Sequence, residues 1–110
     1  MTTIKVRWAQ SGFHRWPEAP QRVEYLRHIH RHLFHFQVEL GVDHQDREVE
    51  FHQLLGQCQS MLELPLSEPT RFSCEDMAAS ILYRLTEIYP KRWAAVECWE
   101  DNECGARVTT

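Results

Sequence analysis

Histidine is concentrated in one part of this sequence. Five of the seven histidines, His14, His28, His30, His32 and His35, lie within a window of 22 residues. In an extended strand, residues i and i+2 project to the same side, so His30 and His32 can direct ring nitrogens at one point. Three imidazole ligands at roughly 2.0–2.1 Å, with a fourth position left for water or substrate, are typical of a catalytic zinc site. His14 is the only histidine before His28, and it is therefore the candidate for the third ligand.

Two other interpretations of the same histidines stay open from the residues alone. The segment RHIHRH, residues 27–32, also fits a solvated basic strand end, which is the commoner meaning of an isolated His-x-His pair. His28 and His30 have the same spacing as His30 and His32, and the apolar residues that follow suit either pair.

The elements that position these histidines follow from the apolar pattern. Alternation predicts a strand over Thr2–Ala9 and a longer one over His30–Leu40, with both histidines of the pair on its apolar face. A glycine and two prolines predict a loop from Ser11 to about Gln21, which places His14 in a loop. If the two strands form a hairpin, His14 comes alongside the pair.

The second half of the chain predicts two helices and another strand pair. Apolar residues at three- and four-residue spacing predict a helix over Phe51–Leu62. A second helix begins with a capping residue at Ser73 and ends before Pro90. Alternation returns over Trp93–Glu100, and Ala106–Thr109 is a short hairpin partner. The order ββααββ predicts an α+β fold, a four-stranded antiparallel sheet with two helices packed on one face.

Length and composition favour one soluble domain over residues 1–110. The chain has 43% apolar residues and a formal charge of −4, which argues against a nucleic-acid partner. It has neither a membrane-length apolar run nor a secretory start, so we expect a cytoplasmic protein that has no membrane partner and keeps its four cysteines reduced. Because a short open sheet leaves two edges unpaired, we also expect a homo-oligomer.

Several segments together resemble the 6-pyruvoyl-tetrahydropterin synthase and 6-carboxy-tetrahydropterin synthase family. The segment HRHLFHFQV, residues 30–38, resembles the family's HGHxYxVxV motif, whose two histidines bind zinc. FHRW around His14 is similar to the region of the family's first zinc ligand. The resemblance implies a Zn²⁺ cofactor held by His14, His30 and His32, and it selects this pair over His28 and His30.

The resemblance extends to two acidic residues. SCEDMA, residues 73–78, resembles the family's PTxENxA helix start, and VECWED, residues 96–101, resembles its VxVxET strand end. Glu75 and Glu100 are the matching acids and the candidate substrate-binding residues. The family glutamate equivalent to Glu100 anchors the pterin ring, because one carboxylate can accept two parallel N–H bonds from an aminopyrimidinone edge.

The family implies a T-fold, a hexameric assembly and a lyase-type enzyme that acts on a pterin or a deazaguanine-pathway compound. This sequence lacks two sets of catalytic residues that the family pattern contains. The family cysteine four residues before the histidine pair is Leu26, and the family Asp-His pair falls at Leu62-Glu63-Leu64-Pro65. His28 and His52 are the candidate catalytic residues, and Cys98 is the nearest spare thiol. The alternative function is a catalytically inactive module that binds a metal and a pterin or purine-derived ligand.

Overall fold

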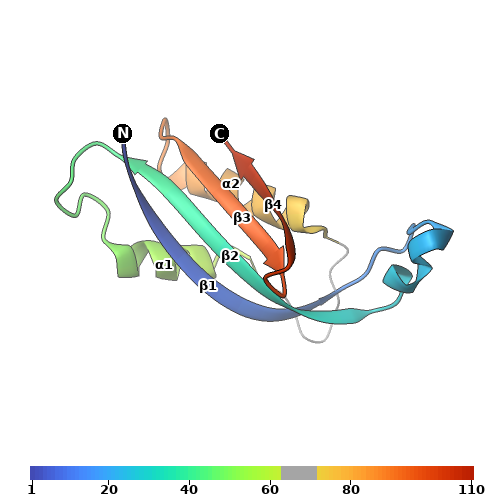
Figure 1. The fold of residues 1–110 in the computed structure, drawn as a ribbon. Coiled ribbons are helices and arrows are strands. Elements are labelled where there is room, and N and C mark those ends of the chain that lie inside the picture. Colours follow the sequence, from blue (N-terminus) through green and yellow to red (C-terminus); the bar gives the residue numbers. More distant parts are fainter. Residues whose placement is uncertain (63–71) are drawn as a thin grey trace.

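A computed structural model describes residues 1–62 and 72–110 and contains one four-stranded antiparallel sheet in the order β1-β2-β3-β4 (Figure 1). The strands are β1 (Thr2–His14), β2 (His30–Val42), β3 (Ala94–Glu100) and β4 (Cys104–Thr109). Both α-helices cover the same face: α1 (Phe51–Gln59) packs on β1, and α2 (Cys74–Ile88) packs on β3 and β4. The predicted α+β fold and its ββααββ order are confirmed.

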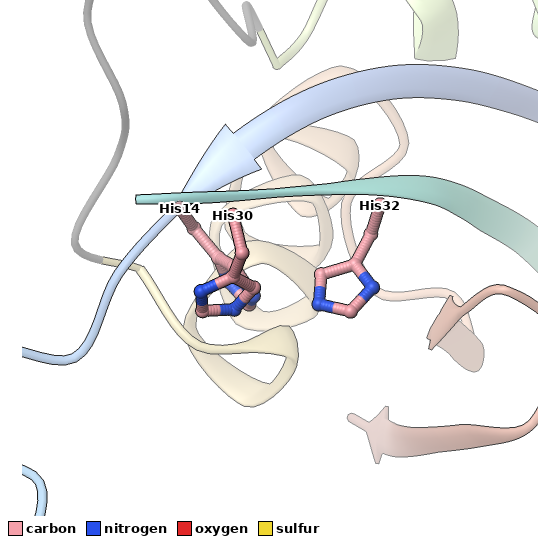
Figure 2. A group of neighbouring side chains, drawn as sticks. All are labelled: His14, His30 and His32. Atoms are coloured by element: carbon pink, nitrogen blue, oxygen red, sulfur yellow. The ribbon is translucent and has the colours of Figure 1, made fainter. Parts of the chain in front are cut away.

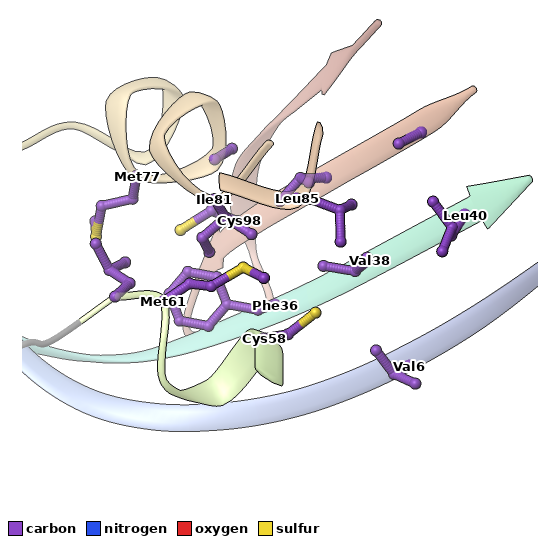
Figure 3. Close-up of a cluster of buried hydrophobic side chains, with 14 of the residues drawn as sticks. Val6, Phe36, Val38, Leu40, Cys58, Met61, Met77, Ile81, Leu85 and Cys98 are labelled. Carbon is purple, nitrogen blue, oxygen red and sulfur yellow. The ribbon is translucent and has the colours of Figure 1, made fainter. Parts of the chain in front are cut away.

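Alternation along the strands accounts for the core between the sheet and the helices. Every second residue of β2 from Phe34 to Leu40 is buried, and the residues between them are more exposed. These side chains meet Leu54 and Cys58 of α1 and the apolar stripe of α2 (Figure 3). His30 and His32 continue the same face of β2 toward its start. The histidine pair therefore lies at one end of the hydrophobic core.

The strand pairing leaves part of the β1–β2 hairpin extending past the rest of the sheet. β1 and β2 pair along their whole length, but β2 pairs with β3 only from Phe34 to Leu40. Residues 11–33 form a hairpin arm that projects beyond β3 and carries a short 3-10 helix, η1 (Gln21–Arg27) (Figure 1). The sequence pattern did not predict this helix, because it is short and has no buried residues.

The position of His14 corrects the sequence-based expectation. β1 was expected to end at Ala9 and a loop to begin at Ser11, but the strand continues to His14. Gly12 does not break it, because the backbone there pairs with His32 of β2 and the site is buried. Cross-strand pairing thus outweighs the weak strand preference of glycine. His14 is held on a strand and lies directly opposite His30.

The helix boundaries differ less from expectation. Glu50 begins α1 by accepting hydrogen bonds from the backbone N–H groups of His52 and Gln53, and Ser73 caps α2 by accepting from that of Asp76. α1 ends at Gln59 rather than Leu62. The Glu63-Leu64-Pro65 part of the segment matched to the family Asp-His pair lies outside the described residues.

Candidate metal centre

The register of the β1–β2 hairpin brings three histidines together. His14 is paired with His30, and His32 lies two residues further along the same face of β2. The ring centroids of His14 and His30 are 4.4 Å apart, those of His30 and His32 are 4.9 Å apart, and those of His14 and His32 are 5.0 Å apart. All three rings project to the same side of the hairpin (Figure 2). One nitrogen from each ring lies within 4.8 Å of the other two, so the cluster could hold a metal ion.

Hydrogen bonds fix which nitrogen of each ring is available. His14 Nδ1 lies 3.2 Å from the carbonyl oxygen of Phe72, and His30 Nδ1 lies 2.8 Å from that of His28. His32 Nδ1 lies 2.6 Å from a carboxylate oxygen of Asp101. Because these oxygens can only accept, each Nδ1 carries the proton and donates it. In the neutral ring Nε2 then has a lone pair, the arrangement that metal-binding histidines show in proteins.

Burial favours the neutral, metal-binding form at His14. The residue is only 8% exposed, and burial lowers the pKa of His14 below its ordinary value of 6.5. The hydrogen bond to Phe72 and the charge of Glu100 oppose this shift but do not cancel it. Within the described part of the chain, Nε2 of His14 and Nε2 of His32 are buried without a hydrogen-bond partner. A buried nitrogen lone pair without a partner is costly unless a hydrogen-bond donor or a cation meets it.

Two carboxylates from the end of β3 surround the cluster. Glu100, the last residue of β3, places Oε1 3.3 Å from His14 Nε2 and Oε2 3.7 Å from His32 Nε2. Asp101 begins the following turn at a positive φ of 51° and also accepts a hydrogen bond of 2.9 Å from the backbone N–H of Leu33. The sequence analysis identified Glu100 but missed Asp101; an Asp-Asn turn directly after the strand was the signal that could have pointed to it.

An open cleft of about 610 Å³ adjoins the histidines. Its lining includes both predicted substrate-binding acids, Glu75 at the start of α2 and Glu100. His14 and His30 form part of one wall, and the exposed aromatic side chains of Trp16 and Phe72 line the cleft as well. A cleft of this size is suited to a small heterocyclic molecule.

The two candidate catalytic histidines lie elsewhere. His28 follows η1 and lines a separate surface hollow, although its carbonyl oxygen holds His30 in place. His52 lies in the first turn of α1 with its side chain 86% exposed, 4.0 Å from Glu50. Neither is among the residues that line the cleft. Their catalytic roles stay predictions.

The family thiol has no counterpart in the cleft, and the predicted spare thiol, Cys98, is poorly suited to nucleophilic attack. Leu26, which matches the family cysteine, lines the cleft with a hydrocarbon side chain. Cys98 is buried, and its pKa is raised, first by a hydrogen bond with Cys74 and then by burial. Cys74 and the exposed Cys104 line the cleft and were not predicted. All four cysteines are free, as expected from the sequence.

No protein-family model matches the chain, and no curated protein matches it. The resemblance to the 6-pyruvoyl-tetrahydropterin synthase family therefore stays a prediction that rests on the motifs. In the described ranges, 1–62 and 72–110, no helix is long and apolar enough to cross a membrane.

Proposed function

We propose that this protein is a zinc-dependent, 6-pyruvoyl-tetrahydropterin synthase-like protein that binds and converts a pterin or deazaguanine-pathway compound. The observation that carries the proposal is the set of His14, His30 and His32, whose Nδ1 atoms all face oxygen acceptors and which each offer one nitrogen within 4.8 Å of the other two. Three imidazoles in partly buried surroundings suit Zn²⁺, which binds neutral histidine nitrogens and commonly takes four ligands in a tetrahedron.

The residues that line the cleft favour a planar, nitrogen-rich ligand. Glu100 offers a carboxylate that can accept two parallel N–H bonds from an aminopyrimidinone edge, and Glu75 adds a second acceptor. Trp16 and Phe72 offer aromatic surface on which a flat ring can stack. The metal, when bound, would polarise a hydroxyl or carbonyl oxygen of that ligand or activate water. The chain's own residues bind the ring and orient it.

A second candidate function is a binding module without turnover. It is favoured by Leu26, because the cleft has a hydrocarbon side chain at the position of the family thiol. The metal and the ring-binding acids would then serve recognition alone.

Incubation of zinc-loaded protein with a panel of dihydropterin triphosphates and deazaguanine precursors separates these functions. Mass spectrometry reports conversion, and quenching of tryptophan fluorescence reports binding. The proposal expects a product with wild type and none with His32→Ala. The matched control is His35→Ala, which removes an imidazole from the opposite face of the same strand and leaves conversion intact. Binding without product supports the binding module, and the absence of both overturns the pterin assignment.

A further inference from the structure

Glu100 lies unusually close to the metal-binding nitrogens for a residue whose expected partner is a ring in the cleft. It is paired with Phe34 of β2, so its side chain emerges beside His32 and across from His14. Its two oxygens are divided between the two rings, Oε1 near His14 and Oε2 near His32. The carboxylate therefore bridges the two buried nitrogens instead of pointing only into the cleft.

The contacts between Glu100 and these nitrogens are not hydrogen bonds. Nδ1 of His14 faces the carbonyl oxygen of Phe72 and Nδ1 of His32 faces Asp101, so in a neutral ring the proton is on Nδ1 and Nε2 presents a lone pair. A carboxylate oxygen also presents lone pairs. Two such atoms 3.3 Å apart repel each other unless a proton or a metal cation lies between them. Nor does either Nε2 have a hydrogen-bond partner among the residues that the structure describes.

The spacing fits shared coordination of one ion. Bonds of roughly 2.0–2.2 Å to nitrogen and oxygen ligands in a tetrahedron place neighbouring ligand atoms about 3.3–3.6 Å apart. The distance from His14 Nε2 to Glu100 Oε1, 3.3 Å, matches this value. The distance from His32 Nε2 to Oε2, 3.7 Å, is longer than this edge, as is the 4.8 Å within which the three histidine nitrogens lie, so the side chains must draw together around a bound ion.

We infer that Glu100 is the fourth ligand of the metal ion when the cleft holds no ligand, so that the centre then consists of three imidazoles and one carboxylate. This inference rests on the proposed metal centre and goes beyond it, because an anchoring role for Glu100 alone leaves the fourth position to water. A ring that binds through Glu100 must take the carboxylate from the metal. Binding of the ring in the cleft therefore frees the fourth coordination position of the metal ion at the same time.

Cobalt(II) substitution tests this assignment without measuring any activity. Four-coordinate Co²⁺ absorbs visible light more strongly than Co²⁺ with added water ligands, so its spectrum reports the ligand set. For Glu100→Ala we expect an altered visible spectrum and Co²⁺ binding weaker by roughly tenfold or more, because losing even an outer-shell partner of a metal ligand costs about 10- to 100-fold. Glu100→Gln keeps the shape of the side chain, so a folding defect is not expected in this variant. Its Co²⁺ spectrum should also change.

Glu103→Ala is the matched control, since it removes one exposed carboxylate from the same turn. We expect it to keep the wild-type spectrum and an affinity within about twofold, because an exposed charge is largely screened. If Glu100→Ala and Glu100→Gln both keep the wild-type spectrum and affinity, Glu100 is not a ligand and the inference is overturned, while the three-histidine centre stands. If wild type itself binds no Co²⁺, the proposed centre and this inference both fail.

Discussion

Asp101 connects the turn after β3 to the metal-binding histidines. One carboxylate oxygen accepts from His32 Nδ1 and the other from the backbone N–H of Leu33, while the backbone N–H of Asp101 donates to the carbonyl oxygen of Leu33. These three bonds orient the ring of His32 and attach the turn to β2. The two bonds that the carboxylate accepts lower the pKa of Asp101 below its ordinary value of 3.8, with the His32 bond as the first cause.

We predict that Asp101→Asn weakens zinc binding by roughly 10- to 100-fold. The amide has one acceptor oxygen for two donors, and its NH₂ group faces a donor if the side chain turns over. Competition with a chromophoric zinc chelator measures the change, with Glu103→Gln as the control for charge. Unchanged zinc affinity in Asp101→Asn would mean that the contact does not position His32.

The sequence predicted part of this arrangement. Strand alternation placed His30 and His32 on one face, because that relation depends only on local geometry. The oxygen atoms that accept hydrogen bonds from the histidine Nδ1 atoms could not be predicted from the sequence. Phe72 is 58 residues from His14 along the chain and Asp101 is 69 residues from His32, and only the packed sheet and α2 bring them together.

Gly105 is the residue on which the close packing of β3 and β4 depends. It pairs with Trp99, and a Cβ built on it would lie 2.5 Å from the carbonyl oxygen of Cys98 and 2.6 Å from Trp99 Cδ2. We predict that Gly105→Ala lowers the free energy of unfolding by about 1–3 kcal/mol, since the nearest obstacle is backbone. Urea unfolding followed by tryptophan fluorescence measures this value.

Gly56→Ala is the control for that substitution. Gly56 is exposed in α1, and a Cβ there meets no atom within 4 Å. Alanine should stabilise the helix by about 0.5–1 kcal/mol. The two glycine substitutions are thus expected to have opposite signs, and destabilisation of similar size at both positions would contradict the packing described for β4.

Glu50 makes the stability of α1 sensitive to acid. Its carboxylate accepts from the backbone N–H groups of His52 and Gln53, and these bonds lower its pKa below the ordinary 4.5. The folded state therefore binds a proton less readily than the unfolded state does. The stabilising contribution is present above the ordinary pKa and is lost as the pH falls through the lowered one.

We predict that Glu50→Gln is less stable than wild type at neutral pH and that the difference shrinks at an acidic pH below the lowered pKa, where the wild-type carboxylate is protonated. Urea midpoints of both proteins at the two pH values give the comparison. A difference that does not change with pH would show that the carboxylate charge at the start of α1 has no stabilising role.

Most elements were predictable because their periodic patterns are strong. The strands after His30 and Trp93 alternate clearly, and Ser73 and Pro90 bound α2. The end of β1 was not predictable, because a glycine such as Gly12 predicts the end of a strand unless the pairing with the partner strand is known. The η1 helix likewise has no periodic apolar face from which it could be inferred.

The open edges of the sheet bear on the whole molecule. In residues 1–62 and 72–110, the outer edges of β1 and β4 have no strand partner. Tyr25 and Ile29 on the hairpin arm are 67% and 56% exposed. Unpaired edges and apolar side chains of this kind favour association with further copies.

We predict that sedimentation at micromolar protein gives a species several times heavier than the 13.1 kDa chain. Tyr25→Ser with Ile29→Ser tests the contribution of the arm and should lower the mass or make it depend on concentration. A wild-type protein that sediments as a monomer over the whole concentration range would refute the expected homo-oligomer.

Metal content is the most direct test of the central claim. Wild type, His30→Ala, His32→Ala and the control His35→Ala are loaded with zinc, passed through a desalting column and examined by elemental analysis. We predict about one zinc ion per chain in wild type and His35→Ala, and loss of most of it in the other two. Wild type that retains no metal, or His30→Ala and His32→Ala that retain as much as wild type, would contradict the three-histidine centre.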